Sequence, residues 1–411
     1  MEMLEKWLTP RRLWVYPRAA LCAAVIGFVG TIVLSRGLTT RQGEPLGGDY
    51  PVFYAVASLV RDGRSGDVFD VAAVQQAQAD ALGKDQLSGY HAWVYPPYTA
   101  LLLVPLSLLP YLPSYVVFSL LMAAAVWAGV RLLGQVVPGI DAHRGTVFAA
   151  AVTFYPMLRA VCGGQNTALT FLLLCGSLVM LLRQRGVAGG IFLGLLMCKP
   201  HFGLPMIAYA LLAGQRTAVL VSLGVTSLLA ALATAVFGFS WPGQWLATVA
   251  RYRELEGTIN GPNLVSLVGV SERLLGPGLG SLVVAAVPSL LLVVWLCVRT
   301  WQADGARRDL AGSWAVATAV LILVAPHAQF YEVGLLALPG MLLADRRRMA
   351  AAPALLVLYL AGWSHAVLVE PWFQPLFLVA LGGLAAALPL LRTPMDERLS
   401  PAAPRASSRT S

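Results

Sequence analysis

Long apolar stretches recur along the whole chain, and they limit more than any other feature what it can fold into. An α-helix needs about 20 apolar residues to cross hydrocarbon, and fewer where the helix is broken or covered by protein. Twelve stretches approach that length, at residues 18–35, 113–133, 146–161, 166–183, 187–198, 201–214, 216–237, 279–299, 311–326, 329–344, 350–368 and 373–391. We therefore expect an all-α polytopic membrane protein with about 12 transmembrane helices, in the range 11–13.

The composition supports a lipid environment and excludes two other classes. Hydrophobic residues make up 58% of the 411 and charged residues only 12%, against about 25% charged in soluble domains. The net charge of +9 does not indicate nucleic acid, because the basic residues lie in short loops between apolar runs. Zinc sites and disulfides are not expected, because the cysteines lie in or beside apolar runs without metal-ligand spacing. They are Cys22, Cys162, Cys175, Cys198 and Cys297.

The apolar stretch 95–110 decides the predicted orientation. It begins with Tyr95-Pro96-Pro97 and ends at Pro110, so we interpret it as a re-entrant or interfacial element rather than a span. This choice collects most loop arginines on one side, which the positive-inside rule makes cytoplasmic. The arginines are Arg131, Arg144, Arg183, Arg185, Arg216, Arg307, Arg308 and Arg346–Arg348. Both termini then lie in the cytoplasm of a plasma-membrane protein.

Two large loops fall on the outer side in this topology, at 36–112 and 238–278. The first is expected to hold interfacial helices near 52–62 and 70–82, whose mixture of apolar and polar residues suits a membrane surface. Residues 1–392 are expected to form a single transmembrane domain. The tail 393–411, rich in Pro, Ser and Arg, is expected to be disordered.

Asp49 follows Gly47-Gly48, directly after the first span. The glycines allow a tight turn and a close approach to a ligand, and a carboxylate there could accept a proton from an attacking hydroxyl. The alternative is a helix cap for a helix that starts near Pro51. From spacing alone, the cap is the simpler interpretation.

Gln165 and Asn166 follow another glycine pair, at the outer start of a span. Their amides could bind sugar hydroxyls or could cap the helix. Near the outer end of the preceding span, Arg159 could meet a phosphate or extend to the interface.

Lys199 precedes Pro200 between two short apolar runs, at the tip of an expected hairpin that stops short of the surface. No acidic residue is near it in sequence, so a phosphate is a plausible partner. A lysine that extends to the interface remains the alternative.

A polar break at 326–332 separates two late spans on the outer side and contains His327 and Gln329. The histidine could bind phosphate or move a proton, and an ordinary polar turn is the alternative. Asn263, in the second outer loop, is a further candidate for binding a ligand.

A series of short segments between residue 48 and about 332 resembles glycosyltransferase family 87, whose members transfer mannose from a polyprenyl-phosphate donor and have the GT-C membrane fold. No segment is specific alone, but their order is, although Phe69 stands where a tyrosine is typical. The segments are Gly48-Asp49-Tyr50 through Tyr54, Arg61-Asp62-Gly63, Val68-Phe69-Asp70, Tyr95-Pro96-Pro97, Pro105-Leu106, Leu109-Pro110, Gly164-Gln165-Asn166, Gly194 through Lys199-Pro200, and Asn263-Leu264-Val265-Ser266.

The resemblance implies roles for these residues. Asp49 would be the general base and His327 a second catalytic group, while Lys199 and, less strongly, Arg159 would hold the donor phosphate. Sugar or acceptor binding would involve Tyr50, Tyr54, Gln165, Asn166, Asn263 and Gln329. The reaction would invert configuration at the sugar and use no metal or other cofactor. Its partners would be membrane lipids, the lipid-phosphate donor and a lipid or glycan acceptor.

A transporter or a lipid-linked sugar flippase is the main alternative, since it would also have many spans and a few buried polar groups. Transporters of that kind typically show inverted repeats around a midplane site, and no such repeat is evident in the sequence. An assembly subunit without activity is a third possibility, and it would tolerate substitution of Asp49. The sequence leaves the sugar, the acceptor and the oligomeric state open.

Overall fold

The computed structural model describes residues 9–85, 91–259, 261–302, 309–346, 348–368 and 374–391. The regular secondary structure of these residues is helical. Their β-type pairing is limited to isolated bridges, such as that of Leu264 with Gln329. The expected tail 393–411 lies outside the described residues. The division into one transmembrane domain and a tail stays a prediction.

Four described helices are long and apolar enough to cross a membrane, or five if one bent pair counts as a single span. The four are α2 (Pro10–Val33), α7 (Tyr111–Gly134), α14 (Arg216–Phe237) and α17 (Leu279–Gln302). The bent pair is α9 (Arg144–Thr153) and α10 (Tyr155–Cys162), which meet at 77°. Pro156 explains the bend, because its ring would clash with the Val152 carbonyl in a continuous helix.

Six further apolar helices are shorter than a typical span. They are α11 (Thr167–Leu182), α12 (Gly186–Leu195) with its 3₁₀ extension η2 (Leu196–Cys198), α13 (Pro200–Leu212), α18 (Leu310–Val324), α20 (Arg348–Trp363) and α21 (Pro375–Ala387) with η7 (Leu388–Leu391). Nearly every side chain of α11 and α18 is buried, as expected for helices that are apolar on all sides. The all-helical membrane character is confirmed, whereas the number of crossings remains a prediction.

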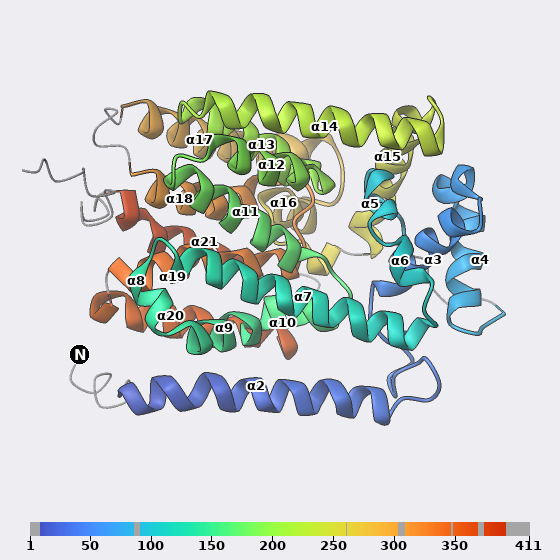
Figure 1. Ribbon diagram of the computed structural model, residues 1–411, viewed down its shortest axis with the longest axis horizontal. Helices are drawn as coiled ribbons and strands as arrows, with labels where there is room; N and C mark the ends of the chain where they lie inside the picture. Colours follow the sequence, from blue (N-terminus) through green and yellow to red (C-terminus); the bar gives the residue numbers. More distant parts are fainter. Residues whose placement is uncertain are drawn as a thin grey trace, which may run out of the picture.

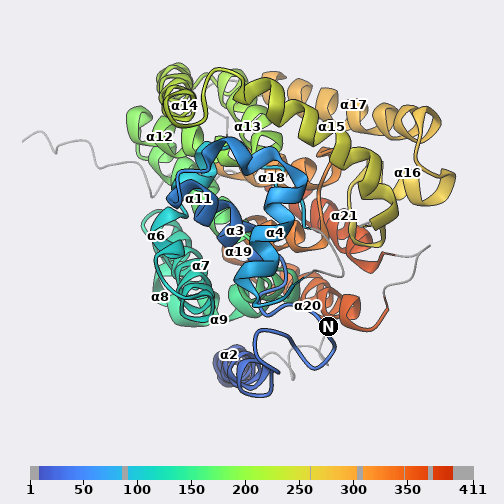
Figure 2. The same cartoon turned by 90° about the vertical axis from the view of Figure 1, so that its right-hand side faces the viewer.

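The helix α2 stands apart from the rest of the bundle in both Figure 1 and Figure 2. None of its apolar window is buried by protein, and it packs on α9, where Arg18 donates to Thr146 Oγ1 at 2.7 Å. A helix with so much exposed apolar surface requires lipid around it.

The predicted outer loops lie together at one end of the bundle, beyond the ends of α2, α7 and α14 (Figure 1). This end is called the Asp49 end below. The elements here are α3 (Tyr50–Arg61), η1 (Ser65–Phe69), α4 (Val71–Ala81), α5 (Tyr98–Leu101), α6 (Val104–Ser107) and α15 (Trp241–Ile259). Seen end-on, α3 and α4 lie across the bundle (Figure 2).

The structure corrects one sequence expectation at this end and adds detail to two others. The predicted interfacial helix near 52–62 is present as α3, but most of its side chains are buried against protein. The stretch 95–110 forms two helices of four residues each rather than one span, in agreement with the re-entrant or interfacial interpretation. The loop 238–278 is largely helical, with α15 followed by η3 (Gly261–Asn263) and α16 (Leu267–Leu275).

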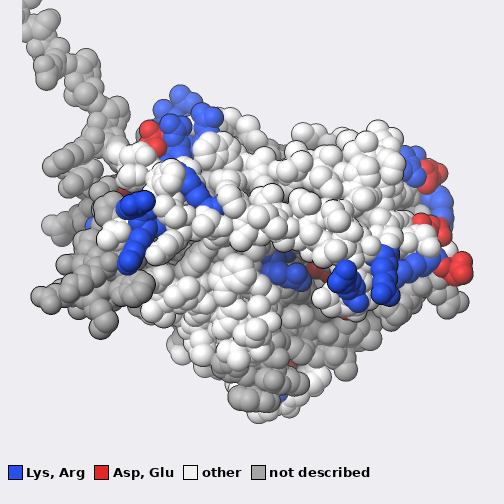
Figure 3. Space-filling view, turned by 90° about the horizontal axis from the view of Figure 1, so that it is seen from below, with Lys and Arg blue, Asp and Glu red and all other residues white. Residues whose placement is uncertain are grey.

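The remaining described helices complete the other end and the C-terminal part. They are α8 (Pro138–Ala142), η5 (Phe330–Leu336), α19 (Ala337–Arg346) and η6 (Ser364–Ala366). On the face drawn in Figure 3, most charged side chains gather toward the two ends, with largely uncharged surface between them. This distribution is typical of a protein whose middle lies in hydrocarbon.

Candidate functional site

Asp49 stands at the N-terminus of α3, but its carboxylate makes no hydrogen bond to the helix. It instead lies 3.1 Å from His91 Nδ1 and accepts from Gln165 Nε2 at 2.5 Å. About a third of each side chain of the His91–Asp49 pair is exposed, at 35% and 34%. The helix-cap interpretation therefore fails, and the carboxylate is held toward solvent by groups from two other segments.

Two glycine pairs bring these segments together. The amide of Asp49 donates to the Gly163 carbonyl at 3.1 Å, and Gly48 and Gly164 both have positive φ, at 58° and 74°. A Cβ on Gly164 would lie 2.4 Å from the Gly47 carbonyl oxygen, a distance that backbone atoms could not accommodate. The glycines thus serve a backbone-to-backbone contact rather than the close approach to a ligand expected from the sequence.

Asp49 and His91 each stabilise the charged form of the other. Burial alone would raise the pKa of Asp49, but the hydrogen bond and charge of His91, the Gln165 hydrogen bond and the charge of Arg159 hold it below its ordinary value. Burial lowers the pKa of His91, yet Asp49 outweighs that effect and raises the value above 6.5. At neutral pH Asp49 is therefore ionised and available to accept a proton.

Tyr95 connects Gln165, the hydrogen-bond partner of Asp49, to Asn166, the next residue of the same turn. Its hydroxyl lies 3.2 Å from Gln165 Oε1 and 3.3 Å from Asn166 Oδ1, while Asn166 makes no side-chain cap to α11. Burial, followed by the charges of Glu332 and Asp49, raises the pKa of Tyr95 well above 10. The phenol therefore stays protonated, and both amides are engaged by polar groups rather than by helix capping.

Lys199 is buried and paired. Only 3% of its side chain is exposed, and its Nζ lies 2.5 Å from Glu332 Oε1, whose side chain is also 3% exposed. The other carboxylate oxygen of Glu332 lies 3.2 Å from Thr167 Oγ1. This contradicts a lysine that extends to the interface, and it gives Lys199 an acidic partner that is distant in sequence.

These contacts place Asp49 and Lys199 in one continuous polar cluster. Gln165, Asn166 and Thr167 are consecutive, so the turn before α11 touches Asp49 at one side and Glu332 at the other. Lys199 is positioned by Pro200, which starts α13, and by Tyr98, whose hydroxyl donates to the Met197 carbonyl at 2.7 Å. The two groups that the sequence placed on one membrane side thus lie at one end of the bundle.

Two histidines lie beside Lys199. The ring of His201 is 6.2 Å from the ring of His327, which is 5.6 Å from the ring of Tyr252 in α15. Nε2 of His201 is buried and has no hydrogen-bond partner among the described residues. A buried polar atom without a partner indicates a missing ligand or water.

The second outer loop meets the polar break next to these histidines. The amide of Val265 donates to the Ala328 carbonyl at 2.9 Å, and Leu264 bridges to Gln329. This places the segments of Asn263 and Gln329 side by side, although Gln329 is only 8% exposed.

Three other sequence candidates have different outcomes. Tyr50 is 1% exposed among aromatic rings, and its hydroxyl lies 2.5 Å from Ser114 Oγ, so it is a core residue that no sugar reaches. The hydroxyl of Tyr54 donates to the Leu109 carbonyl at 2.9 Å, which ties α3 to the segment after α6. Arg159 is exposed on α10, and its charge acts on Asp49.

The sequence analysis missed several members of the cluster. His91 was not selected because a lone histidine in a long loop carries no pattern. Tyr95 was named only as the start of an apolar stretch and of one segment of the family resemblance. Glu332 was seen in the polar break, but 133 residues separate it from Lys199, and nothing in the spacing pairs them. His201, two residues after Lys199, was not selected either.

No cluster of three or more His, Cys, Asp or Glu side chains suited to a metal ion occurs within the described ranges. The chain was also compared with known proteins. A model of glycosyltransferase family 87 matches residues 93–326, which is more than half of the 411 residues. No curated protein and no solved structure matches the chain. The matched region contains Tyr95, Gln165 and Lys199, whereas Asp49 and His91 precede it.

Proposed function

The chain belongs to glycosyltransferase family 87, and from this membership we propose that it moves a sugar from a polyprenyl-phosphate donor to a hydroxyl of a lipid or glycan acceptor. Membership of this family makes the protein a glycosyltransferase. We propose three further features. The donor is a polyprenyl-phosphate sugar, the sugar is mannose as is typical of the family, and the reaction takes place on the outer face of the plasma membrane.

One observation carries the assignment of Asp49 as the base. Its carboxylate is ionised, partly exposed and turned away from its own helix toward His91 and Gln165. In the proposed step, the acceptor hydroxyl gives its proton to Asp49 as its oxygen forms the new bond to the anomeric carbon. The bond from that carbon to the phosphate oxygen breaks on the opposite face, and the lipid phosphate leaves with the electron pair, so configuration inverts.

The donor phosphate is proposed to bind in the part of the cluster formed by Lys199, His201 and His327, with the exposed Arg159 as a second cation near Asp49. Lys199 has three donors, of which Glu332 uses one here. Fixed donors around a leaving phosphate favour the transition state, because the negative charge of the phosphate develops there. We propose that Asn166, Asn263 and Gln329 orient the sugar or the acceptor.

The direct test uses purified enzyme in lipid nanodiscs, supplied with polyprenyl-phosphate mannose labelled in the sugar and with a lipid extract that contains acceptors. We expect release of polyprenyl phosphate in proportion to labelled acceptor. GDP-mannose serves as the matched soluble donor and should give no transfer. Transfer from GDP-mannose without transfer from the lipid donor would overturn the proposal.

His91 is proposed to position Asp49 and to keep it ionised, and this gives a pH prediction. In His91→Gln the lowering effect of the imidazolium is lost while burial remains, so the pKa of Asp49 rises. The acid limb of the kcat/KM profile should therefore move to higher pH, with activity largely retained at neutral pH. His143→Gln, an exposed histidine at the opposite end, should leave the profile unchanged. An unmoved acid limb in His91→Gln would contradict the role.

The same pair contributes to stability only within a pH window. The contribution of Asp49 is present above its ordinary pKa of 3.8 and is lost as pH falls through its lowered folded-state value. The contribution of His91 is present below 6.5 and is lost as pH rises through its raised value. Both contributions are therefore present between about pH 4 and 6.5.

A further inference from the structure

A hollow of about 740 Å³ lies between the turn that joins α11 to α12 and the turn that joins α13 to α14. Its volume falls within the range of roughly 300–1,000 Å³ that is typical of ligand pockets. Thr167 and Asp49's partner Gln165 are at the start of α11, whereas this hollow lies past its end. The 16 residues of α11 separate the two regions by roughly 24 Å, so the hollow is not part of the candidate active site.

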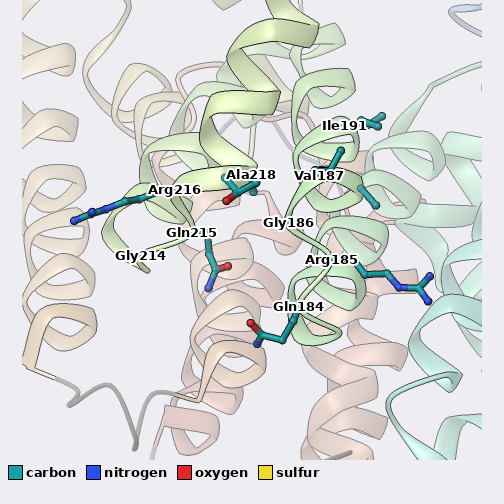
Figure 4. Close-up of a pocket in the computed structure, with 11 residues that line it drawn as sticks. Gln184, Arg185, Gly186, Val187, Ile191, Gly214, Gln215, Arg216 and Ala218 are labelled. Atoms are coloured by element: carbon teal, nitrogen blue, oxygen red, sulfur yellow. The ribbon is translucent and has the colours of Figure 1, made fainter.

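The hollow lies where two closely packed helices, α12 and α14, begin. A Cβ on Gly190 would lie 2.5 Å from the Ala218 carbonyl oxygen, and one on Gly194 would lie 2.5 Å from Val225 Cβ. The two helices therefore run side by side in the same direction and begin at the same level. This places Arg185, directly before α12, and Arg216, the first residue of α14, on the two sides of the hollow (Figure 4).

The charged residues that line the hollow are both arginines. Gln184 and Gln215 lie between the two arginines (Figure 4), and no Asp or Glu is among the lining residues. Both arginines are exposed, and no carboxylate in the described part of the chain pairs with either guanidinium. Neither α12 nor α14 has a side-chain cap at this end. Figure 4 shows the two guanidinium groups directed outward, on opposite sides of the hollow. An anion between the turns would draw these exposed side chains inward and neutralise both charges.

The other part of the lining is apolar and open. Val187 and Ile191, one turn apart on α12, line the hollow and are 57% and 43% exposed. Beyond the hollow on α14, Leu220 and Leu223 are also exposed, at 70% and 51%. A free phosphate ion would leave this apolar surface uncovered, whereas the acyl chains of a lipid would cover it.

We propose that this hollow binds the phosphate headgroup of an anionic glycerophospholipid, with Arg185 and Arg216 as its cationic ligands and with an acyl chain along Val187 and Ile191. Basic recesses between transmembrane helices are typical sites for anionic headgroups. The lipid would belong to the leaflet opposite the Asp49 end. The bound lipid would stabilise the paired start of α12 and α14, independently of which sugar the enzyme transfers.

The test measures binding of phosphatidylglycerol to the full chain in detergent, by native mass spectrometry and by the rise in unfolding temperature on lipid addition. Phosphatidylcholine is the zwitterionic comparison lipid. Arg185→Gln and Arg216→Gln should each weaken phosphatidylglycerol binding roughly fivefold, and the double variant roughly 25-fold. Phosphatidylcholine binding should not change.

The matched control is the double variant Arg131→Gln with Arg299→Gln, which removes two exposed arginines from the last turns of α7 and α17. It should bind phosphatidylglycerol as the unmodified protein does. An equal loss in this control would show a diffuse charge effect and overturn the site. Inorganic phosphate that competes fully with the lipid at millimolar concentration would instead show an ion site and overturn the lipid assignment.

Discussion

Asp49→Asn is expected to abolish sugar transfer, with kcat falling by about 10²- to 10⁴-fold, the usual contribution of a positioned general base. The amide that replaces the carboxylate cannot take the proton of the acceptor hydroxyl. It can still accept a hydrogen bond from Gln165, so the turn that holds Gly163 and Gly164 against Gly47 and Gly48 should persist. The measurement is the initial rate with saturating polyprenyl-phosphate mannose, together with the unfolding temperature of the same sample.

The matched control is Asp62→Asn, because Asp62 lies at the other end of α3, is 53% exposed and pairs with its neighbour Arg61. That variant should retain nearly full activity. An Asp49→Asn enzyme that folds and transfers sugar at the normal rate would remove Asp49 as the base, and it would leave the protein without a candidate proton acceptor at that turn.

Lys199→Met is expected to produce the largest loss of stability. The substitution leaves the Glu332 carboxylate buried without a cation, and the Thr167 hydroxyl is its remaining hydrogen-bond partner among the described residues. Removal of one partner from a buried pair typically costs about 3–5 kcal/mol. Thermal unfolding in mild detergent should shift down by several degrees. The same change at the exposed pair of Arg64 with Asp67, Arg64→Met, should cost at most about 1 kcal/mol.

The double variant Lys199→Met with Glu332→Gln separates the structural role of Lys199 from its proposed function. Because no uncompensated charge remains buried, most of the lost stability should return. Donor binding should not return, and the KM for the polyprenyl-phosphate donor should stay at least about tenfold raised if the lysine contacts phosphate. Recovery of both stability and donor affinity would exclude Lys199 from the phosphate site. Normal stability in Lys199→Met would contradict the buried pair.

The helices themselves were predictable from the sequence where the apolar pattern is long. The stretch 216–237 coincides with α14, and the helices expected near 52–62 and 70–82 differ from α3 and α4 by at most two residues at each end. The broken pair α9 and α10 was expected as a single span, because a count of apolar residues does not register the bend at Pro156. The burial of α3 was missed because its mixed composition suits a membrane surface and a protein contact equally well.

The site was predictable only in part. Asp49 and Lys199 were selected, and the family resemblance is confirmed by the match over residues 93–326. Tyr50 was selected because it shares a segment of the family resemblance with Asp49, yet its side chain points into an aromatic core. Adjacent residues on a helix point about 100° apart, so proximity to a functional residue in sequence does not predict proximity in space.

The sequence by itself determined that this chain is a helical membrane protein and a member of a glycosyltransferase family, because apolar length and the order of short motifs can be read along one dimension. Only the tertiary structure decided that Asp49 meets His91 and Gln165, and that Lys199 meets Glu332. Those pairs join segments as much as 133 residues apart. Their formation depends on how glycine turns and helix ends pack together, which no local pattern records.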